Sequence, residues 1–298
     1  MVYRFLITLL LLLVSTAPTA APAQRIPLHS WPGVLTLCGE PVPLHRQDVR
    51  EMMDQAFIAS VYNQPQVILW IKRAHRYFPY VEKRLRERKL PDDLKYIAVV
   101  ESALKTYVIS SAQAVGPWQF INGTAKRYRL RTDRWIDERY HFERATEAAL
   151  DYLSDLYGEF RNWTLAIAAY NCGENRLAKS LQVQEVKSFY DTDLPLETEA
   201  YIFRILAAKI ILARPEVYGY AIPAADRYAP LEYDEIDLSL PHETPVTVIA
   251  RAGDTTYKII REMNPEIRQQ SLPSGNFKLR LPKGKAKGFH ERLKKELP

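Results

Sequence analysis

The sequence is poor in the residues that build metal centres and covalent cross-links. Its 298 residues include two cysteines, Cys38 and Cys172, and six histidines that lie far apart. It contains no CxxC, HExxH or Cys/His cluster, the spacings that are typical of zinc sites. We therefore expect no metal and no other cofactor. The two cysteines leave two alternatives open, a single disulfide or two thiols that never meet.

The sequence also lacks a hydrophobic run of about 20 residues, the length that spans a bilayer. Its longest apolar run covers residues 5–14, follows a short basic start and leads to an A-x-A site at Ala23. This order is typical of a secretory signal peptide, residues 1–23, cleaved before Gln24. A retained N-terminal anchor is the alternative. Cys38 lies too far beyond the run to be a lipid-attachment site.

Charge of neither sign dominates, although basic residues are in excess. The 41 Lys and Arg against 35 Asp and Glu give a net charge of +6, which favours contact with an anionic polymer such as nucleic acid or a bacterial wall. The basic residues are scattered except in the tail Lys278–Lys295, so we expect no nucleic-acid surface. The 18 tyrosines suit a groove for sugar rings as well as a core.

Apolar residues make up 47% of the chain, enough for a packed core. Their spacing predicts a mainly α protein, with a helical domain followed by a small α+β module. The module is expected to begin with a short β-like run. Beyond the signal peptide we predict these segments: an extended arm with helices at 24–89, a helical domain at 90–224, a linker at 225–245, the module at 246–284 and a basic tail at 285–298.

One carboxylate occupies an unusual position. Glu101 falls on the apolar stripe of a predicted helix that opens after Leu90, together with Leu94, Ile97 and Leu104 at spacings of three and four. Burial in an apolar wall raises the pKa of a carboxyl group, so that it can donate a proton near neutral pH. We expect Ser102 and the loop after it to orient this side chain. The alternative is a buried glutamate paired with Lys or Arg.

If Glu101 is a catalytic acid, the next question is whether the sequence offers a second carboxylate to work with it. Enzymes that cleave a glycosidic bond with water ordinarily use two carboxylates. Four acids in the region after Glu101 are candidates by position, but nothing in their local pattern separates them from solvated loop charges: Asp133, Asp137, Glu138 and Glu143.

Three stretches in a fixed order carry a resemblance to a known family. They are Glu101-Ser102-Ala103, the GPWQF stretch at 116–120 and the AYNCGE stretch at 169–174. Their order and spacing resemble the family 23 lytic transglycosylases, whose domains are of goose-lysozyme type. The resemblance covers roughly residues 90–219. Further matching stretches lie at 137–139, 146–153 and 194–209.

The resemblance implies a lysozyme-like helical fold with a substrate groove, in which residues 90–224 are the catalytic domain. It also implies a reaction on peptidoglycan glycan strands in the periplasm. Glu101 would protonate the β-1,4 bond between N-acetylmuramic acid and N-acetylglucosamine. It would then act as base on the muramic C6 hydroxyl, closing a 1,6-anhydro ring without water, which explains the missing second acid. Two alternatives stay open: a goose-type lysozyme that hydrolyses the bond, and a non-catalytic wall-binding protein. We expect a monomer, and any wall-machinery protein partner is unknown.

The resemblance also implies a set of substrate-binding residues. Ser110 would bond the N-acetyl group, Gln119 would contact the sugar or fix the groove, and the Tyr170 hydroxyl would lie near Glu101. The full set is Ser110, Gln119, Phe120, Ile121, Tyr170 and Asn171.

Two positions depart from the family, which usually has Leu at Pro117 and Ala or Met at Cys172. Pro117 stiffens the loop and removes a backbone donor. The segment Val246–Pro282 resembles a lysin motif and departs from it in the middle and in its approach strand. It is interpreted either as a glycan-binding module or as a packing module without a ligand.

Overall fold

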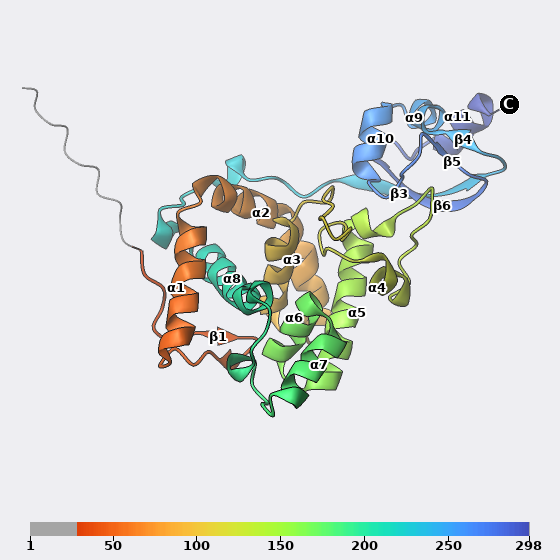
Figure 1. The fold of residues 1–298 in the computed structure, drawn as a ribbon. Helices are drawn as coiled ribbons and strands as arrows, with labels where there is room; N and C mark the ends of the chain where they lie inside the picture. The colour runs from red at the N-terminus through yellow and green to blue at the C-terminus, as the bar shows by residue number, and fades with distance from the viewer. Residues whose placement is uncertain (1–28, 298) are drawn as a thin grey trace, which may run out of the picture. The chain divides into compact units, whose positions relative to one another are not determined.

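The structure is a computed structural model that describes residues 29–297. The predicted signal peptide, 1–23, lies outside the described residues. The chain divides into two units, Met1–Ser30 and Trp31–Pro298, and every helix and strand of the described residues belongs to the second (Figure 1). Among the described residues, no helix combines the length and the apolar character that a membrane crossing requires.

Helices around one hydrophobic core make up most of residues 31–226, which confirms the prediction of a mainly α fold. A two-stranded ribbon, β1 (Thr36–Leu37) with β2 (Glu40–Pro41), precedes them. The helices are α1 (Gln47–Val61), α2 (Gln64–Glu87), α3 (Lys95–Ser102), α4 (Asn122–Arg127), α5 (Phe142–Phe160), α6 (Trp163–Cys172), α7 (Glu174–Val183) and α8 (Leu196–Ala213). Short 3-10 turns are η1 (Asp92–Leu94), η2 (Glu138–Tyr140), η3 (Phe189–Asp191), η4 (Pro215–Tyr218) and η5 (Ala224–Asp226).

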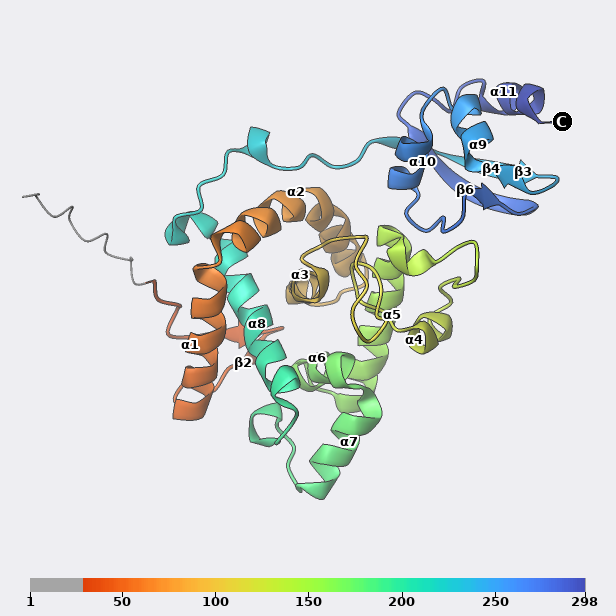
Figure 2. The same cartoon turned by 45° about the horizontal axis from the view of Figure 1, so that its top comes forward.

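Helix α3 is short and central. Figure 2 shows it surrounded by α2, α5, α6 and α8. The helix ends because Ala103 and Leu104 both adopt left-handed backbone angles, with φ of 53° and 59°, and Leu104 turns into the core with 1% exposure. Glu101 therefore lies in the last turn of α3, where the chain leaves the core.

Helix α6 is held at its N-terminus by two side chains. The Asn162 side chain caps the helix by accepting a hydrogen bond from the Leu165 amide. The Glu40 carboxylate of β2 accepts bonds from the Trp163 amide (2.6 Å) and from the amide and hydroxyl of Thr164 (3.0 and 2.8 Å). A negative charge at this end also complements the helix dipole. The ribbon thus fixes the helix that carries Tyr170.

Glu40→Gln should lower the melting temperature of the protein. Loss of the charge weakens the bonds to the first turn of α6, and a cap of this kind contributes about 1 kcal/mol. Thermal unfolding followed by circular dichroism measures the effect. Glu159→Gln, an exposed position on α5, is the matched control and should leave the melting temperature within about 1 °C. An equal shift in both variants would contradict the capping role.

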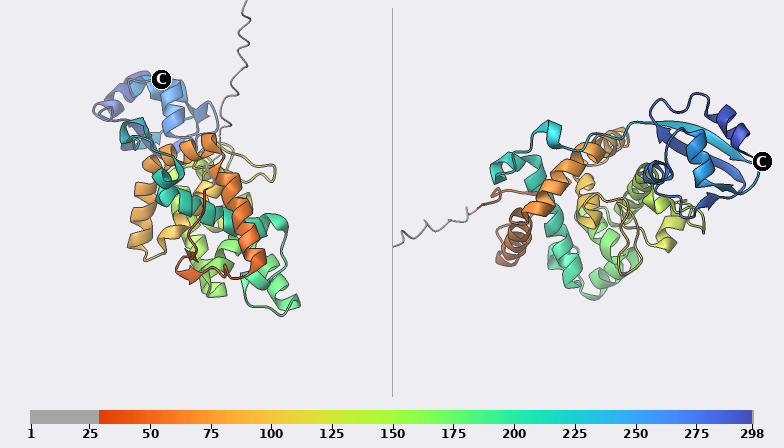
Figure 3. Two further views of the ribbon diagram at one scale, coloured as in Figure 1. Left: turned by 90° about the vertical axis from the view of Figure 1, so that its left-hand side faces the viewer. Right: turned by 90° about the horizontal axis from the view of Figure 1, so that it is seen from above.

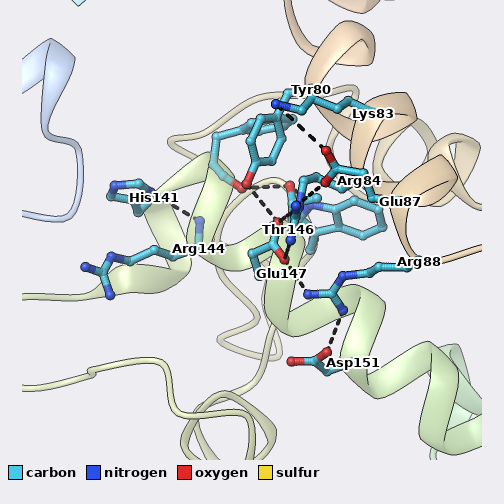
Figure 4. A network of polar contacts seen from close by, with 12 residues as sticks. Tyr80, Lys83, Arg84, Glu87, Arg88, His141, Arg144, Thr146, Glu147 and Asp151 are labelled. Carbon is cyan, nitrogen blue, oxygen red and sulfur yellow. Dashed lines mark hydrogen bonds and ion pairs between the residues drawn. The ribbon is translucent and has the colours of Figure 1, made fainter. Parts of the chain in front are cut away.

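A polar network joins α2 to α5 (Figure 4). Glu147 on α5 accepts hydrogen bonds from the Tyr80 hydroxyl at 2.8 Å, from Arg84 at 2.6 and 2.9 Å, and from Arg88. The neighbouring Thr146 hydroxyl accepts a bond of 2.9 Å from the indole N–H of Trp118, which is fully buried. The same turn of α5 therefore anchors both α2 and the GPWQF stretch.

The C-terminal module has a hydrophobic core of its own. Strand β3 (Tyr233–Leu240) pairs antiparallel with β6 (Gly275–Pro282), and β4 (Thr244–Pro245) pairs with β5 (Ser271–Leu272). The helices of the module are α9 (Val246–Ala252), α10 (Tyr257–Met263) and α11 (Phe289–Glu296). The connection before β3 runs along α2, where the Tyr228 amide donates to the Lys72 carbonyl at 3.2 Å (Figure 3).

Three predictions made from the sequence differ from the structure. The segment 225–245, predicted as a linker, contains β3, an acidic strand that was not recognised because only one of its faces is apolar. The β-like run predicted at the start of the module is α9, which buries Val246, Ile249 and Ala250 at helical spacing. Helix α4 starts only at Asn122 because Gln119, with φ of 49°, interrupts the helix predicted from Trp118.

Candidate active site

Glu101 is partly exposed, as a proton donor to a substrate has to be. The Tyr201 hydroxyl of α8 donates a hydrogen bond of 2.5 Å to its Oε1 atom. Burial among protein atoms raises the pKa of Glu101 to about 7, against the lowering effects of the Tyr201 bond and the Arg204 charge; the charge of Glu197 raises it further. In the described part of the chain no salt bridge to Glu101 is found. The site thus presents a carboxyl group that is about half protonated near neutral pH.

Tyr201 is a candidate site residue that the sequence analysis missed. Its side chain is 2% exposed, and both burial and the nearby Glu101 raise its pKa well above the ordinary value, so it remains a donor. Tyr170, expected near Glu101, is close enough for the charge of that residue to raise its pKa. Its hydroxyl, however, donates to the Trp118 carbonyl at 2.7 Å.

The loop from 108 to 120 is organised by its own polar side chains. Ser110 Oγ accepts a bond of 3.1 Å from the Ala114 amide. The Gln119 amide nitrogen donates to the Gly116 carbonyl at 2.8 Å. Val115 and Phe120 exchange two backbone bonds of 3.0 and 3.1 Å. The contacts of Ser110 and Gln119 with a sugar therefore stay predictions, while their role in shaping the loop is visible.

Three further candidate residues lie around this loop and the end of α6. Phe120 is buried and meets the Tyr170 ring edge to face, with ring centres 6.3 Å apart. Asn171 Oδ1 accepts a bond of 2.9 Å from the Thr198 hydroxyl, which ties α6 to α8. Ile121 is 51% exposed, so it is available for an apolar contact with a substrate.

Ser102 does not orient Glu101 as expected. Its hydroxyl lies 2.9 Å from the Pro117 carbonyl and 3.1 Å from the Ala98 carbonyl. The physical reason is that Ser102 lies on the buried side of α3, whereas the Glu101 side chain is partly exposed. Ser102 instead joins the end of α3 to the GPWQF stretch.

The four acids considered as a second carboxylate are occupied elsewhere. Each forms an ion pair with an arginine: Asp133 with Arg131, Asp137 with Arg139, Glu138 with Arg144 and Glu143 with Arg280. The carboxylate whose charge acts on Glu101 is Glu197, exposed in the first turn of α8.

The two cysteines, Cys38 and Cys172, are free thiols, which decides between the two alternatives left open by the sequence. Burial raises the pKa of both, so neither is a reactive thiolate. Among the described residues, no three or more His, Cys, Asp or Glu side chains are grouped so as to hold a metal ion.

Parts of this sequence match known proteins. Residues 79–192 match the model of the Transglycosylase SLT domain family. It is 31% identical over 227 residues to the membrane-bound lytic murein transglycosylase D of Escherichia coli, which covers 74% of this chain and 49% of that protein. A putative tributyltin chloride resistance protein of an Alteromonas species is 32% identical over 117 residues, covering 38% of this chain and 56% of that protein. The chain thus spans about half the length of these curated relatives.

Parts of the solved structures of two lytic transglycosylases align with this chain. An inactive mutant of Slt from Pseudomonas aeruginosa aligns with a TM-score of 0.41 and 22% identity, over 52% of this chain and 26% of that one. The 70 kDa soluble lytic transglycosylase of Escherichia coli aligns with a TM-score of 0.39 and 20% identity, over 60% of this chain and 33% of that one.

Proposed function

We propose that this protein is a peptidoglycan lytic transglycosylase that cleaves the β-1,4 bond between N-acetylmuramic acid and N-acetylglucosamine without water. The observation that carries the proposal is the position of Glu101, a partly exposed carboxyl group in the last turn of α3 that accepts a hydrogen bond of 2.5 Å from Tyr201 and whose pKa burial raises to about 7. A group with that pKa can donate a proton and then accept one within a single reaction cycle. The similarity to a murein transglycosylase supports the choice of substrate.

The chemistry balances with one acid. Protonated Glu101 gives its proton to the glycosidic oxygen as the bond from muramic C1 to that oxygen breaks, which leaves a free hydroxyl on N-acetylglucosamine. The Glu101 carboxylate then removes the proton of the muramic C6 hydroxyl, whose oxygen bonds to C1. The products are a 1,6-anhydro-muramic end and a regenerated acid. Tyr201 holds the Glu101 carboxyl in one orientation through its 2.5 Å bond.

The candidate residues from the loop 108–121 and the end of α6 would bind the glycan. Exposed Ile121 would offer an apolar surface for a sugar face, next to Phe120, which packs against the Tyr170 ring. Ser110, Gln119 and Asn171 would supply polar atoms, and each side chain is already held by internal hydrogen bonds. Such fixed groups lose little conformational entropy when a substrate binds.

The proposed location is the periplasm, reached through the N-terminal signal pattern, with peptidoglycan as the macromolecular partner. The positive net charge of +6 supports residence near an anionic wall. The chain would act as a monomer, and a wall-machinery protein partner stays unidentified. Glycan binding by the lysin-motif-like module remains a proposal of the same kind.

A hydrolase of goose-lysozyme type is the second candidate, and one observation favours it. Glu197 is exposed and its charge raises the pKa of Glu101, which makes it the candidate for the second acid that a hydrolase needs. A protein that binds the wall without cleaving it is the third.

Digestion of purified sacculi separates these functions. Mass spectrometry of the released muropeptides should show muramic ends lighter by one water than reducing ends. Reducing ends alone would establish the hydrolase, and no released fragments would leave the wall-binding alternative. Glu197→Gln should keep the anhydro products, since the proposed reaction needs no second carboxylate.

Tyr201→Phe tests whether the Tyr201 hydrogen bond lowers the pKa of Glu101 and fixes the orientation of its carboxyl group. The Tyr201 hydrogen bond lowers the pKa of Glu101, so its loss should raise that pKa and move the basic limb of the pH–rate profile to higher pH. The rate at the optimum should fall about tenfold because the carboxyl loses its fixed orientation. Tyr80→Phe removes a hydroxyl that bonds Glu147 and serves as the control with an unchanged profile. Identical profiles for Tyr201→Phe and the parent chain would contradict the role of this bond.

A further inference from the structure

Apart from the covalent connection before β3, the C-terminal module contacts the helical domain through a short segment of the helical domain. This segment, residues 134–139, is here called the shared segment. Two backbone hydrogen bonds of 2.8 Å connect Trp135 and Asp137 to residues 266–268 of the module. Between them, Ile136 pairs antiparallel with Ile267. The shared segment therefore forms an isolated β-bridge with the loop between α10 and β5 of the module.

One side chain of the shared segment belongs to the core of the module. Ile136 is 6% exposed and is part of the module's hydrophobic cluster, while Trp135 packs against the same cluster. Full burial of an Ile side chain contributes about 1.5–3 kcal/mol relative to exposure. The helical domain thus supplies a core residue to the module, which a module tethered only by a linker would not need.

Polar contacts on both sides of the shared segment fix the same interface. Buried Arg280 donates to the Glu143 carboxylate at 2.5 Å. The guanidinium of Arg268 lies 4.1 Å from the centre of the Tyr140 ring. The Tyr107 hydroxyl, from the loop that follows Glu101, donates to the Arg261 carbonyl at 2.6 Å.

The same segment supports the active-site loop from its other side. The Arg139 guanidinium is held by the Asp137 carboxylate at 2.8 and 2.9 Å. It donates to the carbonyls of Phe120 and Gln113 at 3.1 and 3.3 Å. Gly116 packs directly on the Arg139 carbonyl. The loop 113–120 that this arginine supports is the one joined to the end of α3 near Glu101.

We propose that the module is a structural part of the catalytic groove, and that Ile136 is a positioning residue that fixes loop 113–120 through Asp137 and Arg139. The proposal rests on the proposed function, because the reaction at Glu101 is what the loop serves. The module then contributes to turnover of a small soluble glycan, and not only to retention on the wall. Displacement of groove groups by about 1 Å lowers rates by up to about 10²-fold.

Ile136→Ala in the full chain tests the proposal with a soluble oligosaccharide of alternating N-acetylglucosamine and N-acetylmuramic acid. The expected result is a kcat lowered at least about tenfold with KM changed less than about twofold. Hydrogen exchange of the amides in 113–120 should become faster in the same variant. Ile136→Val should restore both values. Lys258→Ala, exposed on α10 of the module, is the control and should leave both unchanged.

Arg268→Ala is the second variant, because it removes one interface contact and leaves both cores filled. It should reproduce the faster exchange in 113–120 and the lower kcat to a smaller extent. Unchanged kcat and exchange in both variants, with weaker retention on sacculi, would overturn the proposal and leave the module as a wall-binding element. Absence of turnover by the unsubstituted chain would overturn the proposed function instead, since the exchange experiment reports on the loop without any reaction.

Discussion

Glu101→Gln should lower the rate of sacculus cleavage at least about 10²-fold at every pH between 5 and 8, since general acid catalysis contributes about 10²–10⁴-fold. Glutamine keeps the size of the side chain and an oxygen that can accept the Tyr201 hydrogen bond, but it cannot deliver or remove a proton. Release of soluble muropeptides over time measures the effect. A variant that retained the parental rate would show that another group donates the proton.

The same substitution should stabilise the folded protein at neutral and alkaline pH. The folded-state pKa of Glu101 is raised to about 7 from 4.5, so ionisation of this group disfavours folding as the pH rises through that interval. Because the glutamine amide never ionises, the advantage of the variant should grow as the pH rises from about 4.5 to 7, stay constant above pH 7 and vanish near pH 4. We expect about 1–3 kcal/mol at pH 8, below the full shift because the side chain is partly exposed. Melting curves across that pH range measure it.

Gly116→Ala should cost about 3 kcal/mol of stability or more, and with it most of the activity. The added Cβ would lie 1.8 Å from the Arg139 carbonyl oxygen, a backbone atom that cannot move aside, and φ at this position is +81°. Both the clash and the left-handed backbone penalise any L side chain. Denaturant unfolding and the cleavage assay measure the two effects.

Gly123→Ala is the matched control for this substitution. Gly123 lies in α4, and a Cβ built there meets nothing within 4 Å. Alanine favours a helix over glycine by about 1 kcal/mol, so the control should be neutral or slightly stabilising. Equal behaviour of the two variants would show that the loop does not rest on the Arg139 carbonyl.

The helices and the acid could be predicted because their signals are local. The apolar spacing predicts a helix over residues 47–88 with a break at Gln64-Pro65, and another over residues 146–160. The structure has α1 and α2 in the first stretch, separated by Tyr62 and Asn63, and α5 over the second. The position of Glu101 on an apolar stripe predicted its raised pKa. Burial of a single side chain within a helix depends mainly on its own neighbours in sequence, so the local pattern was sufficient for it.

The partner of the acid and the coupling to the module depend on contacts far apart in sequence. Tyr201 lies on α8, a helix that is apolar nearly all round, so its hydroxyl gave no reason to expect anything but core packing. Ile136 is one apolar residue in a polar loop, and only the fold brings it to Ile267, more than a hundred positions away. Strand β3 was missed because its alternation places acidic residues on the open face.

The most direct test of this account is the pKa of Glu101 itself. The titration of its side-chain carboxyl carbon can be followed by carbon-13 NMR on the full chain, with Glu101→Gln to assign the signal. The account predicts a midpoint near pH 7, and a higher one in Tyr201→Phe. A midpoint near the ordinary value of about 4.5 would mean that Glu101 is ionised at neutral pH, and it would contradict its role as the proton donor.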